Sequence, residues 1–105
     1  MREVKTRPML EGRATGLSVR WEGGQFCLIA TDRGIVGCGI FKLEVLEEFN
    51  MAGALARGTP SKPLVEPEDL LPAKIVQVSS EAKKLGIREG MTGEQALQKL
   101  LGCRV

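Results

Sequence analysis

The sequence predicts one α/β domain of the α+β type over residues 1–105, a two-layer sandwich with helices packed on one face of a mainly antiparallel N-terminal sheet. Apolar and polar residues alternate with a period of two from residue 15, which is typical of strands with one buried face. Later segments change to a helical period. We therefore expect a β meander over residues 1–41 and a mixed, mainly helical part over residues 42–105.

Three strands are expected in the meander, over residues 15–22, 25–31 and 35–40. Gly23 and Gly24 separate the first two strands, and this pair tolerates the positive φ angles of a two-residue hairpin turn. Pairing Glu22 with Gln25 across that turn places apolar residues opposite apolar residues along both strands.

The turn at residues 31–34 determines which face of the meander is buried. A primed two-residue turn would force a positive φ on Arg33, so we expect a longer turn closed by Gly34 in the left-handed region. Leu28 then pairs with Cys38. The expected core face consists of Leu17, Val19, Trp21, Phe26, Leu28, Ala30, Val36, Cys38 and Ile40.

The opposite face of the meander is mixed in character and contains apolar residues that the helices of so short a chain cannot cover. Adjoining apolar side chains on a sheet usually mark a contact surface, so we expect a homo-oligomer. The residues expected at its interface are Arg20, Ile29, Ile35, Gly37 and Gly39. Cys27 also falls on this face, so no intrachain disulfide with Cys38 is expected.

Residues 42–51 have the apolar spacing of a helix, and residues 53–58 form a short expected strand. Residues 59–67 hold three of the five prolines and must form a loop. Pro67, followed by acidic residues, is typical of the first turn of a helix.

Residues 73–78 are rich enough in β-branched side chains for a strand, yet Ile75 and Val78 continue a helical stripe that ends at Gly86. We expect a helix from about Lys74. The last helix follows Thr92, whose spacing from Gln95 is that of a capping box.

Composition excludes several kinds of chemistry. The chain has no histidine, which removes imidazole-based catalysis and zinc sites that need imidazole. Its three cysteines follow no metal-ligand spacing, so no metal and no cofactor is expected. The formal charge of +2 and the few aromatic residues do not favour nucleic acid. The N-terminus has no secretory pattern and no apolar run spans a bilayer, so we expect a cytoplasmic protein with reduced thiols and no membrane partner.

The stretch from Asp32 to Leu101 resembles the YunC-like family of small bacterial and archaeal proteins, a domain of unknown function. The resemblance is carried by Asp32-x-Gly34 leading to Cys38-Gly39, Asp69-Leu70-Leu71, Ala82 with Leu85-Gly86-Ile87, and Gly90-Met91-Thr92-Gly93 with Glu94, Ala96, Leu97 and Lys99. It implies a two-layer α/β domain whose N-terminal β portion mediates tetramer formation, with no established activity.

Few residues stand out as candidates for chemistry. Cys38 lies between two glycines and is the best nucleophile left without histidine, although a buried cysteine usually acts as a small apolar residue. Asp32 could bind a ligand, but its turn already explains it. Arg57 and Lys62 flank the proline-rich loop and could bind an anion.

Two function classes follow from these candidates. The first is a homo-oligomeric binding or regulatory module without catalysis of its own, which binds an unidentified small-molecule ligand. We expect a homotetramer, with a homodimer as the alternative. The alternative is an enzyme whose active site lies between subunits and uses Cys38 or carboxylates from different chains. Rapid modification of one cysteine by a thiol reagent would favour the enzyme.

Overall fold

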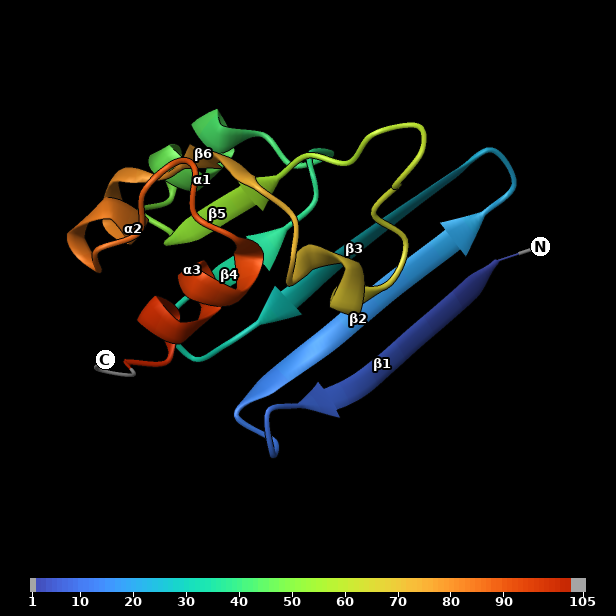
Figure 1. Cartoon of the computed structure of the whole chain (residues 1–105), viewed down its shortest axis with the longest axis horizontal. Coiled ribbons are helices and arrows are strands. Elements are labelled where there is room, and N and C mark those ends of the chain that lie inside the picture. Colours follow the sequence, from blue (N-terminus) through green and yellow to red (C-terminus); the bar gives the residue numbers. More distant parts are fainter. Residues whose placement is uncertain (1, 103–105) are drawn as a thin grey trace.

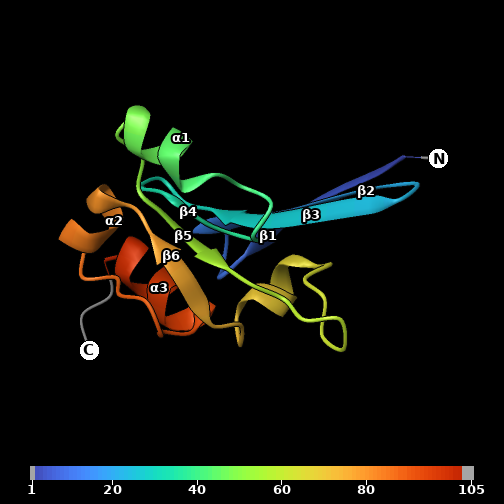
Figure 2. The ribbon, with the colours of Figure 1, turned by 90° about the horizontal axis from the view of Figure 1, so that it is seen from above.

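The computed structural model describes residues 2–102, which form a six-stranded sheet with helices on both faces (Figures 1 and 2). The strands are adjacent in chain order, and all neighbours are antiparallel except β4 and β5, which are parallel. The predicted α+β class with a mainly antiparallel sheet is confirmed. The strands are β1 Glu3–Met9, β2 Ala14–Trp21, β3 Gly24–Ala30, β4 Ile35–Gly37, β5 Gly53–Ala56 and β6 Ile75–Val78.

The helical elements divide between the two faces. A 3₁₀ helix, η1 (Pro67–Leu70), packs on β2 and β3, and α3 (Gly93–Leu100) packs on β4 and β5. Helix α1 (Leu43–Glu48) lies on the opposite side of the sheet from η1 and α3 (Figure 2). The sequence had indicated helices on one face only. The short α2 (Ser80–Lys84) follows β6.

The core lies on the face that η1 and α3 cover. A cross-strand row of Ile29, Val36, Ala54 and Val78 runs through β3 to β6, and each of these side chains is at most 3% exposed. The expected core face is therefore wrong for β2 and β3 and correct for β4 and the residue after it, because Val36 and Cys38 are buried as expected. Leu17, Val19 and Phe26 are only half-buried, and Trp21 is 42% exposed.

The face assignment fails because the turn after β3 is shorter than expected. Neither Asp32 nor Arg33 has a positive φ, and Thr31 N–H donates to the Gly34 carbonyl at 2.8 Å. The Thr31 hydroxyl also accepts from the backbone N–H groups of Arg33 and Gly34, which stabilises the turn without left-handed residues. A two-residue loop shifts the β3–β4 register by one, and a shift of one exchanges the two faces.

Gly34 is required for close packing rather than for its φ angle. A Cβ at this position would lie 2.4 Å from the Ala52 carbonyl oxygen. Beside it, Arg33 donates from Nε to the Leu100 carbonyl at 2.8 Å, which ties this turn to the end of α3.

The expected helix from Lys74 is also wrong, since β6 pairs with the edge of β5. A register irregularity between Leu55 and Ala56 lets Ile75 and Val78 face the core although they are three residues apart. That spacing imitates a helical stripe. Ser79 then caps α2 by accepting from Ala82 N–H.

Other expected elements are confirmed within residues 2–102: the helix now named α1, the strand β5, the proline-rich loop, η1 and α3. The register of the first hairpin differs by two residues from the expected pairing of Glu22 with Gln25. Trp21 pairs with Gly24, and the turn consists of Glu22 and Gly23. Strand β1 was not anticipated, since its charged residues obscure the alternation of Val4, Thr6 and Pro8.

Replacing Thr92 with alanine should lower the free energy of unfolding by about 1 kcal/mol. Thr92 Oγ1 accepts from Gln95 N–H at 3.2 Å, and Gln95 Oε1 accepts from Thr92 N–H at 2.9 Å, so the substitution leaves an N-terminal amide of α3 without its acceptor. Urea denaturation measures the change. Thr92→Ser, which keeps the hydroxyl, is the control and should stay near wild type. Equal stability of Thr92→Ala and wild type would show that the cap contributes nothing.

Candidate functional site

A groove of about 540 Å³ lies where the proline-rich loop and η1 meet the ends of β5 and β6. Arg57 follows β5, Lys62 lies in the loop, and Lys74 precedes β6. Backbone hydrogen bonds between Thr59 and Lys62, at 3.0 and 3.1 Å, fold the loop into a tight turn. The groove is lined by Arg57, Thr59, Lys62, Pro63, Leu64, Glu68, Asp69, Pro72, Ala73 and Lys74.

The charges in this groove are unbalanced. Within residues 2–102, the side chains of Arg57, Lys62 and Lys74 have no ion-pair or hydrogen-bond partner. The two acids are already engaged, because Glu68 binds Arg7 and Asp69 accepts from the backbone N–H groups of residues 65 and 66. Three cations therefore remain available to a ligand.

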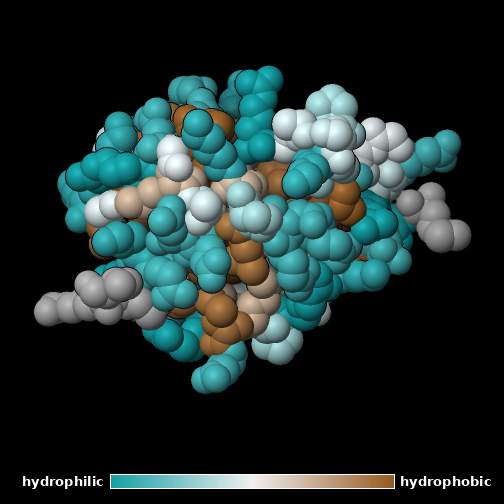
Figure 3. All heavy atoms as spheres, viewed as in Figure 1, coloured by the Kyte–Doolittle hydropathy of each residue, from teal (hydrophilic) through white to brown (hydrophobic). Residues whose placement is uncertain are grey.

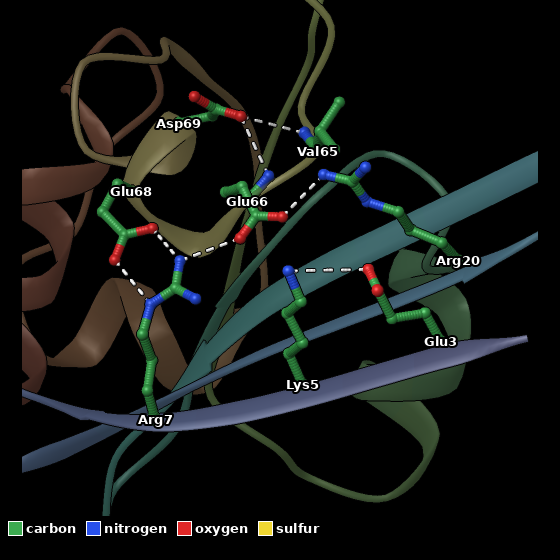
Figure 4. Close-up of polar contacts among 8 residues, drawn as sticks. All are labelled: Glu3, Lys5, Arg7, Arg20, Val65, Glu66, Glu68 and Asp69. Carbon is green, nitrogen blue, oxygen red and sulfur yellow. Dashed lines mark hydrogen bonds and ion pairs between the residues drawn. The ribbon is translucent and has the colours of Figure 1, made fainter.

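The acidic wall of the groove is held to the sheet by an ion-pair network, drawn in Figure 4. Arg7 of β1 donates from Nε to Glu68 at 2.8 Å and from its terminal nitrogen to both Glu68 and Glu66. Arg20 of β2 donates to the other oxygen of Glu66 at 2.7 Å. The guanidinium of Arg7 holds the pKa of both carboxyls below their ordinary value of 4.5, and Arg20 adds to the effect on Glu66.

Two cysteines lie together a short distance along the sheet. The β3–β4 register sets Cys27 opposite Cys38, and Cys38 N–H donates to the Cys27 carbonyl at 3.2 Å. Both are free thiols and both are buried, Cys27 completely and Cys38 to 6% exposure. The prediction that they occupy opposite faces is wrong for the same reason as the face assignment.

The two thiols are not equivalent. A hydrogen bond from the Cys27 thiol lowers the pKa of Cys38 to about 6, and backbone N–H groups of Cys27 and Ile40 contribute further. Burial opposes this shift. The same hydrogen bond, together with burial, raises the pKa of Cys27. Cys38 is therefore the thiol that ionises first.

The structure brings only some of the predicted site residues together. Arg57 and Lys62 share the groove, and Cys38 lies apart from it. Asp32 lines a separate hollow of about 350 Å³ with Arg13 and Arg33.

The five residues expected at the oligomer interface do not share one surface. Ile29 is in the core, whereas Ile35 is half-buried on the face of the sheet that carries α1. Gly37 is buried beside the Phe41 ring, and Gly39 is exposed. Arg20 is engaged with Glu66. These positions cannot form the contact surface that was expected.

Sequence reasoning missed Lys74, the partnership of the two cysteines and the role of Arg7. Lys74 joins the groove only because β6 pairs with β5, which the helical interpretation of this segment concealed. The alternative two-residue turn at Asp32 and Arg33 was the signal that would have paired Cys27 with Cys38. No signal in the sequence indicated that Arg7 contacts residues about sixty positions away.

The face of the molecule that bears η1 and α3 is mostly hydrophilic, with hydrophobic residues exposed across its centre (Figure 3). No group of three or more potential metal ligands occurs among residues 2–102. Within the same residues, no helix is long and apolar enough to cross a membrane.

Sequence and structure comparisons find similarity to proteins of unknown function. The profile described as "Domain of unknown function (DUF1805)" matches residues 37–100. The chain is similar to "Uncharacterized protein YunC" of Bacillus subtilis (strain 168), with 30% identity over 95 residues, which cover 89% of this chain and 92% of that protein.

Among solved structures, the chain is similar to the protein of unknown function TA1206 from Thermoplasma acidophilum. The TM-score is 0.75 and the identity 22%, covering 95% of this chain and 93% of the other. At this identity the likeness concerns the fold alone.

The ion-pair network should make stability depend on pH. Folding lowers the pKa values of Glu66 and Glu68, so their contribution is present above the unfolded value of about 4.5 and is lost as the pH falls through the folded values. Arg7→Met should therefore lower the melting temperature more at pH 6 than at pH 3.

Lys5→Met on the same strand is the matched control, because Lys5 pairs with Glu3 at 3.6 Å and with no other acid among residues 2–102. Thermal melts across this pH range measure both variants. An Arg7→Met difference that does not change with pH would contradict the network.

Proposed function

The chain belongs to the DUF1805 family of unknown function, and we propose that it is a homo-oligomeric module that binds a small anionic ligand in the groove at Arg57. The observation that carries the proposal is the set of three cations around one hollow, Arg57, Lys62 and Lys74, none of which has a side-chain partner among the described residues 2–102. Both acids in the lining are occupied by the protein's own donors. An anion is thus the ligand that this charge distribution favours.

The size and the donors of the groove narrow the ligand class. A volume of about 540 Å³ lies within the usual range for small-molecule sites. The Arg57 guanidinium can donate two parallel hydrogen bonds to a carboxylate or phosphate, and the lysines supply point charges. Leu64, Pro63 and Pro72 provide apolar walls. A carboxylated or phosphorylated small molecule with an apolar portion satisfies these features.

Self-association is proposed through the outer face of β1–β3, which is turned away from η1. Two cross-strand rows cover it: Val4, Val19 and Phe26 form one, and Thr6, Leu17 and Leu28 form the other. Val4 is 56% exposed, and the Trp21 ring extends the surface beside Phe26, with ring centroids 6.1 Å apart. No charged side chain interrupts these rows, and the half-buried side chains of Leu17, Val19, Phe26 and Leu28 keep part of their apolar surface open to solvent.

A second copy of the chain is the occupant that suits this surface. Because this face carries no charged side chain, it cannot attract a charged protein by electrostatic complementarity. In a dimer with two-fold symmetry, the apolar rows of one chain would pack against the same rows of the second chain. The resemblance to YunC-like proteins, which implies assembly through the β portion, supports the same occupant. The assembly proposed is a dimer through this face, or a tetramer that contains it.

Inorganic phosphate serves as the probe of the groove. In ¹H–¹⁵N spectra, millimolar phosphate should shift the amide signals around Arg57, Lys62 and Lys74, and Arg57→Gln should weaken binding about tenfold, because a hydrogen bond between charged groups is lost. Lys83→Gln removes the same charge from α2, outside the groove, and should leave binding unchanged. Equal weakening by both variants, or no shifts at the groove, would contradict the proposal.

Val19→Lys should convert the oligomer to monomers, because a charge then lies in the middle of the outer face. Sedimentation velocity at micromolar concentration gives the mass, and circular dichroism confirms folding. Glu89→Lys, at an exposed position after α2, is the control and should leave the mass unchanged. A monomeric wild-type protein would rule out self-association.

A further inference from the structure

We propose that Cys27 and Cys38 form a redox site, in which a peroxide oxidises the Cys38 sulfur and Cys27 then closes an intramolecular disulfide. The proposal goes beyond ligand binding in the groove and depends on neither the anion nor the oligomer. It rests on the placement of the two thiols, on the donors around one of them, and on a route from solvent.

The placement allows a disulfide without movement of the backbone. Ile29 pairs with Val36 and Leu28 with Gly37, so Cys27 is the direct cross-strand neighbour of Cys38. Directly opposed residues in antiparallel strands have Cα atoms about 4.5 to 5.5 Å apart. Disulfides span Cα separations of about 4.4 to 6.8 Å. The oxidised form therefore fits the fold of the reduced one.

The surroundings assign different roles to the two sulfurs. After β4 the chain turns sharply, with Phe41 N–H donating to the Cys38 carbonyl at 3.4 Å. The Cys27 thiol and the backbone N–H groups of Cys27, Ile40 and Cys38 itself lower the pKa of Cys38, against the effect of burial. These donors stabilise a thiolate, the form that attacks peroxides.

The charged groups that act on Cys27 work in the opposite direction. The contact with Cys38 and burial raise the pKa of Cys27, and the carboxylates of Asp69 and Glu66, on and beside η1, add smaller contributions in the same direction. The pKa of Cys27 is thus raised and that of Cys38 lowered. Cys38 is also the more exposed of the two thiols, so exposure and charge assign the attacking role to the same sulfur.

Solvent reaches one member of the pair. Cys38 is 6% exposed, whereas Cys27 is fully buried. Gly39 is exposed and lines a hollow of about 440 Å³ with Arg57, Val76 and Gln77, one residue from Cys38. Cys38 itself does not line this hollow, so its own 6% exposure is the part of the pair that a molecule as small as hydrogen peroxide can reach.

The chemistry proceeds in two balanced steps. The Cys38 thiolate attacks one oxygen of a hydroperoxide, the O–O bond breaks, and the leaving alkoxide or hydroxide takes up a proton to give an alcohol or water. Cys38 is then a sulfenic acid. The Cys27 sulfur attacks the Cys38 sulfur, the S–O bond breaks, and water leaves with the Cys27 proton. The peroxide gains two electrons, and the two thiols lose them.

Peptide mapping of the wild-type protein tests the proposal without any substitution. Trypsin places Cys27, Cys38 and Cys103 in three separate peptides, spanning residues 21–33, 34–42 and 100–104. After brief treatment of the folded protein with hydrogen peroxide, non-reducing mass spectrometry should show peptides 21–33 and 34–42 joined, with the loss of two hydrogen atoms. Dithiothreitol should restore both.

Variants in a Cys103→Ser background separate the roles of the two thiols. Cys27→Ser should stop at the sulfenic acid, which dimedone traps on peptide 34–42. Cys38→Ser should leave Cys27 unmodified under the same conditions. Circular dichroism of each variant confirms folding. Persistence of both free thiols in wild type, or dimedone labelling of Cys27 instead of Cys38, would overturn the proposal.

Discussion

The pairing of Ile29 with Val36 is the contact on which the rest of the structure depends. Both side chains are fully buried, and because side chains alternate along a strand, this single pairing decides the face of every other residue in β3 and β4. It sets Cys27 beside Cys38 and turns Phe26 and Leu28 outward. The apolar row formed by Ile29, Val36 and Ala54 must be shielded from water. The elements that pack on this side of the sheet are η1 and α3.

That cover explains how the groove is built. Pro67 of η1 packs over Gly16 of β2, and Arg7 and Arg20 bind Glu66 and Glu68 from the adjoining strands. These contacts hold η1 on the sheet and occupy the carboxylates that would otherwise neutralise the groove. Arg57, Lys62 and Lys74 at its rim are left without side-chain partners in the part of the chain that the structure describes. The outer face of β1–β3 receives no such cover, since α1 lies over the far end of the sheet (Figure 2).

Local chemistry made much of the fold predictable. The Thr92 cap, the turn at Pro67 and the helical period of α1 depend on residues close together in sequence, and all three elements are confirmed. Of the apolar stripe expected on α1, only Leu46 is buried, whereas Val45 and Phe49 are exposed.

The predictions that failed depend on residues distant in sequence. Arg33 stabilises the short turn partly by donating to carbonyls at the end of α3. Strand β6 forms because its backbone pairs with the edge of β5. Arg57 and Lys62 were recognisable as cations near one loop, but their meeting with Lys74 required the strand pairing that the sequence pattern concealed.

The β3–β4 register can be measured directly by cross-strand nuclear Overhauser effects between Hα protons. In antiparallel sheets these contacts are strongest at pairs that exchange no backbone hydrogen bonds. The register described above has its hydrogen bonds at Cys27–Cys38 and Thr31–Gly34, so Hα contacts should appear between Leu28 and Gly37 and between Ala30 and Ile35. An Hα contact between Leu28 and Cys38, with none to Gly37, would exchange the two faces and contradict both the cysteine pair and the apolar outer face.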